Sequence, residues 1–174
     1  MSVSSFCSAG VCEAVFEEQS PEITRIVQHD GGTGLHIAVV DPGLTSEQVE
    51  HLAGLGEWDR IMVWEKSVGD VPEGSRFITN ARNKAVEAHF HRETLSAVWA
   101  NRPAVLRSAR VAWYGGVHHH GISVGVSGLS EVRDEEIAYK LVAVPLAKRV
   151  QSNARWGLPE ERVAQIREWG GVLP

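Results

Sequence analysis

Alternating apolar and polar stretches divide the chain into predicted strands and amphipathic helices. Leu35–Asp41 and Arg60–Val68 are short apolar runs bounded by turn-forming residues, which is typical of buried strands. Elsewhere apolar residues recur every three to four positions, which is typical of helices with one buried face. We expect helices over Val11–Glu18, from Ser20, after Thr45, from Asn80 to about Ala100, from Glu131 and from Pro159.

Local signals mark where these helices begin and end. Ser20-Pro21-Glu22 combines a capping hydroxyl, a proline at the first helical position and an acid in the first turn. Thr45 and Gln48 match a capping box, and Thr79 is suited to cap the long helix. Pro145 is expected to bend or end the helix that starts at Glu131.

The second half of the chain predicts an antiparallel sheet. Ser108–Tyr114 reads as a strand, and Val117–Val126 reads as a strand or a pair of strands after a glycine turn. The connections are too short for parallel crossovers. We therefore expect an α+β layer fold with a mostly antiparallel sheet covered by helices, in one domain over residues 1–174.

Composition and net charge limit the partners and the cellular location that we expect for the protein. The net charge of −5 gives no reason to expect nucleic acid or an anionic membrane as a partner. No apolar segment approaches the length that crosses a bilayer. The start of the chain lacks the features of a signal peptide, which predicts the cytoplasm, and Cys7 and Cys12 are expected to be free thiols there.

Three consecutive histidines precede the last predicted strand. In a strand, His118 and His120 would share one face and His119 would lie on the other. Because the small residues Ser123, Gly125 and Ser127 follow in the same segment, the two same-face histidines resemble part of a pocket wall more than ordinary core.

The histidines suggest either metal ligands or an acid–base pair. His89 and Glu93 lie four residues apart on the predicted long helix, so they could complete a site for zinc or non-haem iron with His118 and His120. Alternatively, His118 and His120 act as general acid and base in catalysis. The competing interpretation is an exposed polar hairpin beside a solvated helix face.

Three stretches carry a family resemblance. They are HIAVVDP at His36–Pro42, NKAVEAHFHRET at Asn83–Thr94 and GGVHHHGISVGVSGLSEVRDEEIA at Gly115–Ala138. Together these motifs resemble the GlcG/HbpS family of small α+β proteins, which have a profilin-like sheet. The family usually joins its first two strands by a tight hairpin, whereas this chain inserts a predicted helical segment at residues 44–59 and extends beyond about residue 150.

The resemblance implies a ligand-binding protein. Family members include heme-binding and heme-degrading proteins and redox-linked sensors, and several form symmetric oligomers. The resemblance thus implies heme as the cofactor and a homo-oligomer as the assembly, while the histidines suggest a divalent metal ion as the alternative cofactor. The family-like block also makes Asp134 the acid expected to face inward and to join His118 and His120 as a catalytic residue.

Several other side chains are candidates to bind the ligand. Lys84 could hold a carboxylate such as a heme propionate, and Arg110 and Tyr114 lie near the histidines in sequence. Ser127 begins the turn before the acidic helix. With His89, these residues predict a pocket between the long helix and the histidine strand for a flat or carboxylated small molecule.

Two other functions remain open from the sequence. The first is an enzyme that uses histidine acid–base chemistry or a metal ion on a small organic acid or aromatic substrate. The second is a structural or regulatory subunit without a ligand site.

Overall fold

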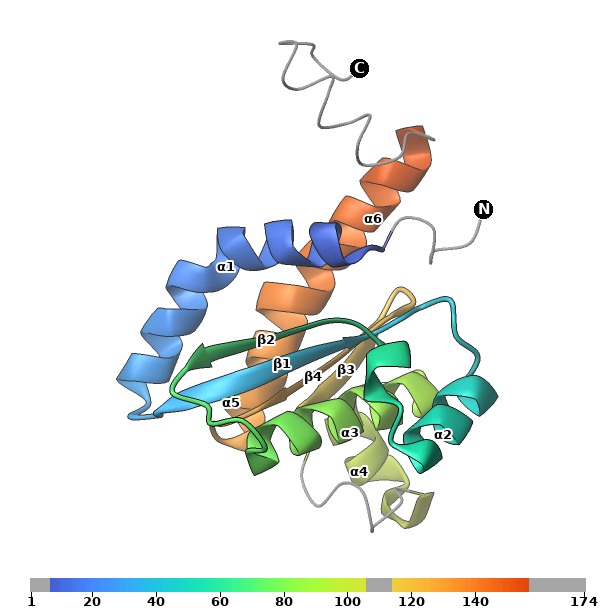
Figure 1. Cartoon of the computed structure of the whole chain (residues 1–174), viewed down its shortest axis with the longest axis horizontal. Helices are drawn as coiled ribbons and strands as arrows, with labels where there is room; N and C mark the ends of the chain where they lie inside the picture. The colour runs from blue at the N-terminus through green and yellow to red at the C-terminus, as the bar shows by residue number, and fades with distance from the viewer. Residues whose placement is uncertain (1–6, 106–113, 157–174) are drawn as a thin grey trace.

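A four-stranded antiparallel sheet forms the centre of the protein, with strand order β2-β1-β4-β3. The computed structural model describes residues 7–105 and 114–156. The strands are β1 (Gly34–Val40), β2 (Met62–Gly69), β3 (Gly116–His119) and β4 (Ile122–Ser127). This arrangement confirms the predicted α+β class (Figure 1). The strand expected at Ser108–Tyr114, except for Tyr114, and the helix expected from Pro159 lie outside the described residues.

Helices cover both faces of the sheet, so β1 is buried along its whole length. Leu35, Ile37 and Val39 pack into the larger hydrophobic cluster with residues of the first and last helices. Ala38 and Val40 point the other way into a smaller cluster beneath the central helices. Successive side chains of a strand point to opposite faces. A strand that is buried on both faces therefore has a continuous run of apolar residues.

The first helix differs from its prediction. α1 runs from Ala9 to His29 as one helix, with Pro21 in its interior and Ser8 as its N-cap. Pro21 lacks a backbone N–H, and α1 changes direction about halfway along its length in Figure 1. The predicted break at Ser20 was wrong because both halves bury apolar residues against the same sheet, which outweighs one lost hydrogen bond.

The segment after β1 folds as predicted. α2 (Ser46–Leu55) begins at Thr45, whose side chain accepts from the Gln48 backbone N–H while the Gln48 side chain accepts from the Thr45 backbone N–H. A short 3₁₀ turn, η2 (Trp58–Arg60), then leads into β2. Val49 and Leu52 of α2 pack into the smaller cluster beside the central helix.

The predicted long helix is two helices. α3 (Arg76–His91) begins at the Ser75 cap and ends at Arg92, which has a left-handed φ of 56°. α4 (Leu95–Asn101) starts after Thr94 and is followed by the 3₁₀ turn η3 (Pro103–Val105). The left-handed residue ends the i to i−4 hydrogen-bond ladder, so side chains after it no longer follow the face that α3 presents to the sheet.

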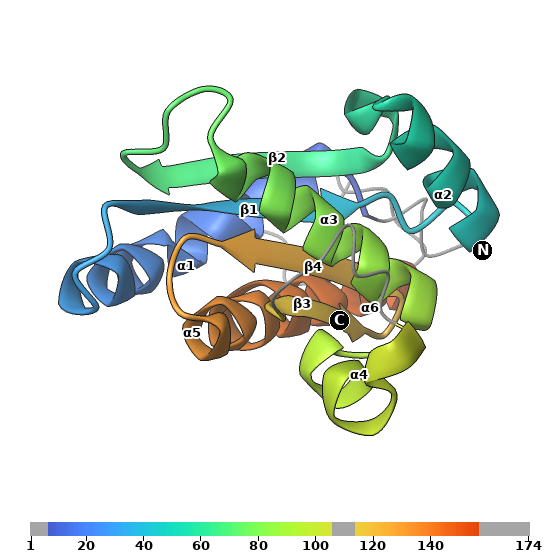
Figure 2. The same ribbon diagram turned by 90° about the horizontal axis from the view of Figure 1, so that it is seen from below.

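α3 packs directly on β4, and Figure 2 shows it crossing the sheet. Gly125 makes this contact possible because a Cβ there would lie 2.0 Å from the Ala81 carbonyl oxygen and 2.5 Å from the Ala85 nitrogen. The small residues of β4 therefore provide room for the backbone of a helix.

β3 and β4 form a hairpin whose turn contains His120 and Gly121. Both residues have positive φ angles, 48° and 86° respectively. His120 is therefore a turn residue and does not share a strand face with His118, so the predicted pairing of these two side chains was wrong. The tight connection places His118 opposite Ser123 in the antiparallel register.

The last helical region is continuous across Pro145. α5 (Glu131–Glu136) is followed by the π-helical segment η4 (Ile137–Ala143) and by α6 (Val144–Trp156). Val144 donates to the carbonyl of Tyr139, five residues earlier. Of the two outcomes predicted at Pro145, a bend or an end, the structure excludes the end, because the wider π turn precedes the residue that has no N–H to donate and the helix continues after it.

Candidate functional site

A buried ion pair joins Lys84 of α3 to Asp134 of α5, beside the turn that follows β4. The Lys84 ammonium donates to Asp134 Oδ2 and to the Val126 carbonyl oxygen, each at 2.9 Å. Asp134 Oδ1 accepts from the Leu129 backbone N–H at 3.0 Å. Lys84 is 3% exposed and Asp134 is 2% exposed, so this pair is almost completely removed from water.

The surroundings of this pair are shaped by burial and by one glycine. Burial raises the pKa of Asp134, while Lys84 and the backbone donors of the turn oppose that change. Gly115 adopts a φ of 126°, and a Cβ there would lie 2.8 Å from both Lys84 Nζ and Asp134 Cβ. A larger residue at position 115 would therefore push against both members of the pair.

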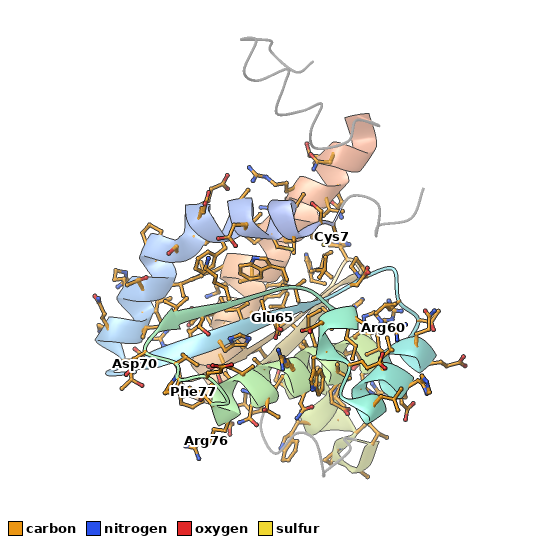
Figure 3. All side chains as sticks on the ribbon, in the orientation of Figure 1. Cys7, Arg60, Glu65, Asp70, Arg76 and Phe77 are labelled. Atoms are coloured by element: carbon orange, nitrogen blue, oxygen red, sulfur yellow. The ribbon has the colours of Figure 1, made fainter. Side chains whose placement is uncertain are left out.

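The ion pair lines a cavity of about 470 Å³ between the start of α3 and the start of α5. We call it the α3–α5 cavity, and its polar lining comprises Arg76, Asn80, Lys84, Ser127, Glu131 and Asp134 together with Ser130 and the turn backbone. Arg76 and Phe77 lie at the beginning of α3, as Figure 3 shows. Three residues singled out from the sequence, Lys84, Ser127 and Asp134, are brought together here.

Sequence reasoning missed Arg76 and Asn80 as lining residues. The prediction started the helix at Asn80, so Arg76 lay outside the predicted helix, whereas α3 begins at Arg76. Their spacing with Lys84, at positions i, i+4 and i+8, places all three on one helix face once the true start of α3 is known. That spacing was the available signal.

A chain of hydrogen bonds links two of the predicted histidines. His89 Nε2 lies 3.1 Å from the Leu44 carbonyl oxygen, and His89 Nδ1 lies 3.3 Å from Ser123 Oγ. His118 Nδ1 lies 2.8 Å from the same hydroxyl. His89 and Ser123 are fully buried, whereas His118 is partly exposed.

The acceptor at one end of this chain sets the direction of every proton in it. The Leu44 carbonyl only accepts, so His89 carries its proton on Nε2. The neutral His89 Nδ1 then accepts from the Ser123 hydroxyl, whose oxygen accepts from His118 Nδ1–H. His118 Nε2 is thereby left with its lone pair.

Both histidines of this hydrogen-bond chain, His89 and His118, are neutral at neutral pH. Burial, aided by the positive charge of Arg92, lowers the pKa of His118 to about 4. The same two causes lower the pKa of His89. His118 Nε2 is therefore an unprotonated nitrogen at neutral pH, available to a proton or to an electron-pair acceptor.

Other predicted site residues lie apart from these two groups. His120 is exposed, and its ring packs edge-on against His119. Glu93 follows the end of α3 and pairs with Arg102 at 2.6 Å, so it does not extend the His89 face as predicted.

Tyr114 lines a second cavity of about 610 Å³ with residues of α4, α5 and η4. Arg110 lies outside the described residues.

The predicted four-ligand metal site does not assemble from these positions. Within residues 7–105 and 114–156, no group of three or more His, Cys, Asp or Glu side chains is arranged to hold a metal ion. The physical reasons are the left-handed end of α3 before Glu93 and the turn conformation of His120.

Comparisons with known proteins add a similarity of fold. The sequence matches no family model and no curated protein. Its structure is similar to that of Klebsiella pneumoniae protein ORFY, described as a DUF336 protein, with a TM-score of 0.49 and 13% identity over 79% of this chain and 88% of that chain. DUF336 designates the GlcG family. At this identity the similarity concerns the course of the chain alone.

The described helices include none with the length and apolar character that a membrane crossing requires.

Proposed function

We propose that the protein binds a small carboxylic acid in the α3–α5 cavity. The observation that carries this proposal is Lys84 in the cavity lining, because its ammonium has three protons and two protein acceptors among the described residues. The third proton is available to a ligand. A charge-assisted hydrogen bond from a nearly dry ammonium to a carboxylate is among the stronger polar contacts in proteins.

The other polar residues of the cavity lining also offer hydrogen-bond donors at fixed positions. Arg76 and Asn80 supply further N–H groups on the same face of α3 as Lys84. Arg76 and Glu131 balance each other in charge, as Lys84 and Asp134 do, so the cavity has no general positive field. A carboxylate would therefore be selected by the positions of the donors, and the volume of about 470 Å³ suits a small organic ligand.

Calorimetric titration tests this proposal with two pairs of probes, benzoate beside benzamide and succinate beside succinamide. We expect saturable binding of at least one acid and none of its uncharged amide. Arg76→Gln and Asn80→Ala should each weaken that binding by about tenfold, because each removes one polar donor. Arg60→Gln is the matched control, since Arg60 is exposed and lies at the far end of the molecule beside α2 (Figure 3).

Equal binding of acid and amide, or no binding of either acid at millimolar concentration, would contradict the proposal. Lys84 needs a separate design because Lys84→Met alone leaves Asp134 buried without its partner, at a cost of about 3–5 kcal/mol. The double variant Lys84→Met/Asp134→Leu replaces the pair by apolar groups. It should fold and fail to bind the acid.

A second candidate is heme, held through its iron by His118. The observation that favours it is the proton order of the histidine chain, which leaves His118 Nε2 unprotonated and fixes its ring through Ser123. Neither of the two cavities described above has His118 in its lining, so this candidate rests on the donor atom alone.

Hemin titration separates this candidate from the first. A saturable Soret shift is expected that is lost in His118→Ala and kept in His120→Ala, because His120 is exposed in the hairpin turn. A shift that is equally strong in both variants would exclude His118 as the ligand.

A further inference from the structure

A serine, a histidine and a glutamate on β1 and β2 form a hydrogen-bonded series outside the α3–α5 cavity. Ser67 Oγ lies 2.9 Å from His36 Nδ1, and His36 Nε2 lies 3.1 Å from Glu65 Oε1. His36 and Ser67 are direct partners in the antiparallel register, and Glu65 precedes Ser67 by two positions on the same face. These three side chains were not identified from the sequence.

Arg82 of α3 holds Glu65, the last residue of the series, in place. Its guanidinium donates two hydrogen bonds to Glu65, one to each carboxylate oxygen, both at 2.8 Å. Although burial opposes the effect, the hydrogen bonds from His36 and Arg82 lower the pKa of Glu65. Glu65 is therefore an anionic acceptor, and Figure 3 shows it on the sheet facing α3.

In the neutral form of the His36 ring, the anionic acceptor determines which nitrogen carries the proton. His36 donates from Nε2 to Glu65, so Nδ1 carries the lone pair. The Ser67 hydroxyl then donates to Nδ1. This is the proton order required of a serine nucleophile, a histidine base and a carboxylate that orients the base.

The serine of the series is accessible to solvent and the histidine is buried, which suits a nucleophile and its base. Ser67 is exposed, whereas His36 is only 6% exposed. β2 is at the edge of the described sheet, and an edge strand presents backbone N–H groups that have no partner strand. Backbone N–H groups of this kind can stabilise the oxyanion that forms during acyl transfer.

We propose that Ser67, His36 and Glu65 form an acyl-transfer centre that hydrolyses small carboxylic esters. Ser67 Oγ bonds to the ester carbonyl carbon while His36 Nδ1 takes the hydroxyl proton. The ester C–O bond breaks, and the alcohol leaves with the proton from His36. Water then attacks the acyl-serine by the reverse proton path and releases the acid. This proposal does not depend on the ligand of the α3–α5 cavity.

The test uses the full chain and a fluorophosphonate probe, which phosphonylates activated serines and releases fluoride. Peptide mass spectrometry should find the adduct on Ser67, and 4-nitrophenyl acetate should release 4-nitrophenolate at a rate that depends on this residue. Ser67→Ala should abolish both. Ser152→Ala is the matched control, because Ser152 is an exposed serine on α6, and its labelling and rate should equal those of the unmodified protein.

Two further variants separate an activated serine from a merely exposed one. His36→Gln should slow labelling of Ser67 by about 100-fold, which is the usual range for loss of a general base. Because His36 is buried, Glu65→Gln serves as the second variant; it keeps the shape of the side chain, removes the charge and should slow labelling by about tenfold.

Circular dichroism and melting curves must show that each variant is folded. An adduct confined to lysines, no adduct on the folded unmodified protein, or equal labelling rates in folded Glu65→Gln and the unmodified protein would each overturn the proposal.

Discussion

Two histidine–serine hydrogen bonds on the same sheet face have opposite proton directions. The Ser67 hydroxyl donates to His36, whereas the Ser123 hydroxyl accepts from His118. The difference is set by the acceptor at the end of each chain, which is Glu65 in one case and the Leu44 carbonyl in the other. At the residue scale, the proton direction of a histidine–serine bond therefore depends on the terminal acceptor, which is one hydrogen bond from His36 and three hydrogen bonds from His118.

The low pKa of His118 predicts a pH dependence of stability. Its pKa is about 4 in the folded protein and 6.5 in the unfolded chain, so between these values the unfolded chain binds more protons. The free energy of unfolding should thus fall as the pH is lowered from 7, with His118 contributing about 2 kcal/mol of the loss at pH 5.

Urea unfolding at pH 7 and pH 5 measures this effect. His118→Gln keeps a hydrogen-bonding group beside Ser123 but does not titrate, so it should lose about 2 kcal/mol less between the two pH values. An identical loss in both proteins would show that His118 does not carry the dependence.

At the scale of elements, the contact between α3 and β4 positions everything that faces it. Lys84 and His89 both lie on α3, and each has a hydrogen-bond partner on β4. The backbone of α3 approaches β4 so closely because Gly125 has no Cβ. A shift of this helix would therefore disturb the ion pair and the histidine chain together.

Gly125→Ala tests that contact. Its Cβ would overlap backbone atoms of Ala81 and Ala85, so we expect a loss of about 3 kcal/mol in the free energy of unfolding. Gly54→Ala is the matched control, because Gly54 lies within α2 and a Cβ there meets nothing within 4 Å. That control should gain about 0.5–1 kcal/mol from better helix propensity.

At the scale of the whole molecule, the sheet separates two hydrophobic clusters of unequal size. The larger lies between the sheet and α1, η4 and α6, and the smaller lies beneath α2 and α3. β1 belongs to both through alternate residues. The homo-oligomer and the cytoplasmic location expected from the sequence remain predictions, and neither is needed to form these clusters.

Native-state hydrogen exchange should reflect this architecture. The amides of β1 and β4 are in the middle of the sheet and under helices on both faces, so their exchange should be the slowest and should require global unfolding. The amides of α2 should exchange faster, since that helix buries only Val49 and Leu52. Equal protection of α2 and β1 would show that the two clusters open as one unit.

Much of the fold was predictable from local pattern. The strands at Leu35–Asp41 and Arg60–Val68 and the capping box at Thr45 needed only apolar runs and short-range hydrogen bonds. The errors at Pro21 and Arg92 occurred where burial of long apolar faces or a left-handed residue overrode a local signal.

The candidate sites were predictable in part. The sequence identified Lys84, Asp134, His89 and His118 as candidate site residues. It grouped His89 with His118 as ligands of a metal site, but it did not pair Lys84 with Asp134 or find the serine between the histidines. Lys84 meets Asp134 across 50 positions and His36 meets Ser67 across 31. Such pairs depend on strand order and register, which no short-range pattern contains.

The sequence by itself determined the class of the fold, because hydrophobic periodicity and capping act within a few residues of each other. The tertiary structure alone decided which polar groups are neighbours and which way their protons point. Those features arise from strand register and from the close approach of α3 to a glycine on β4, and both depend on contacts between residues far apart in the chain.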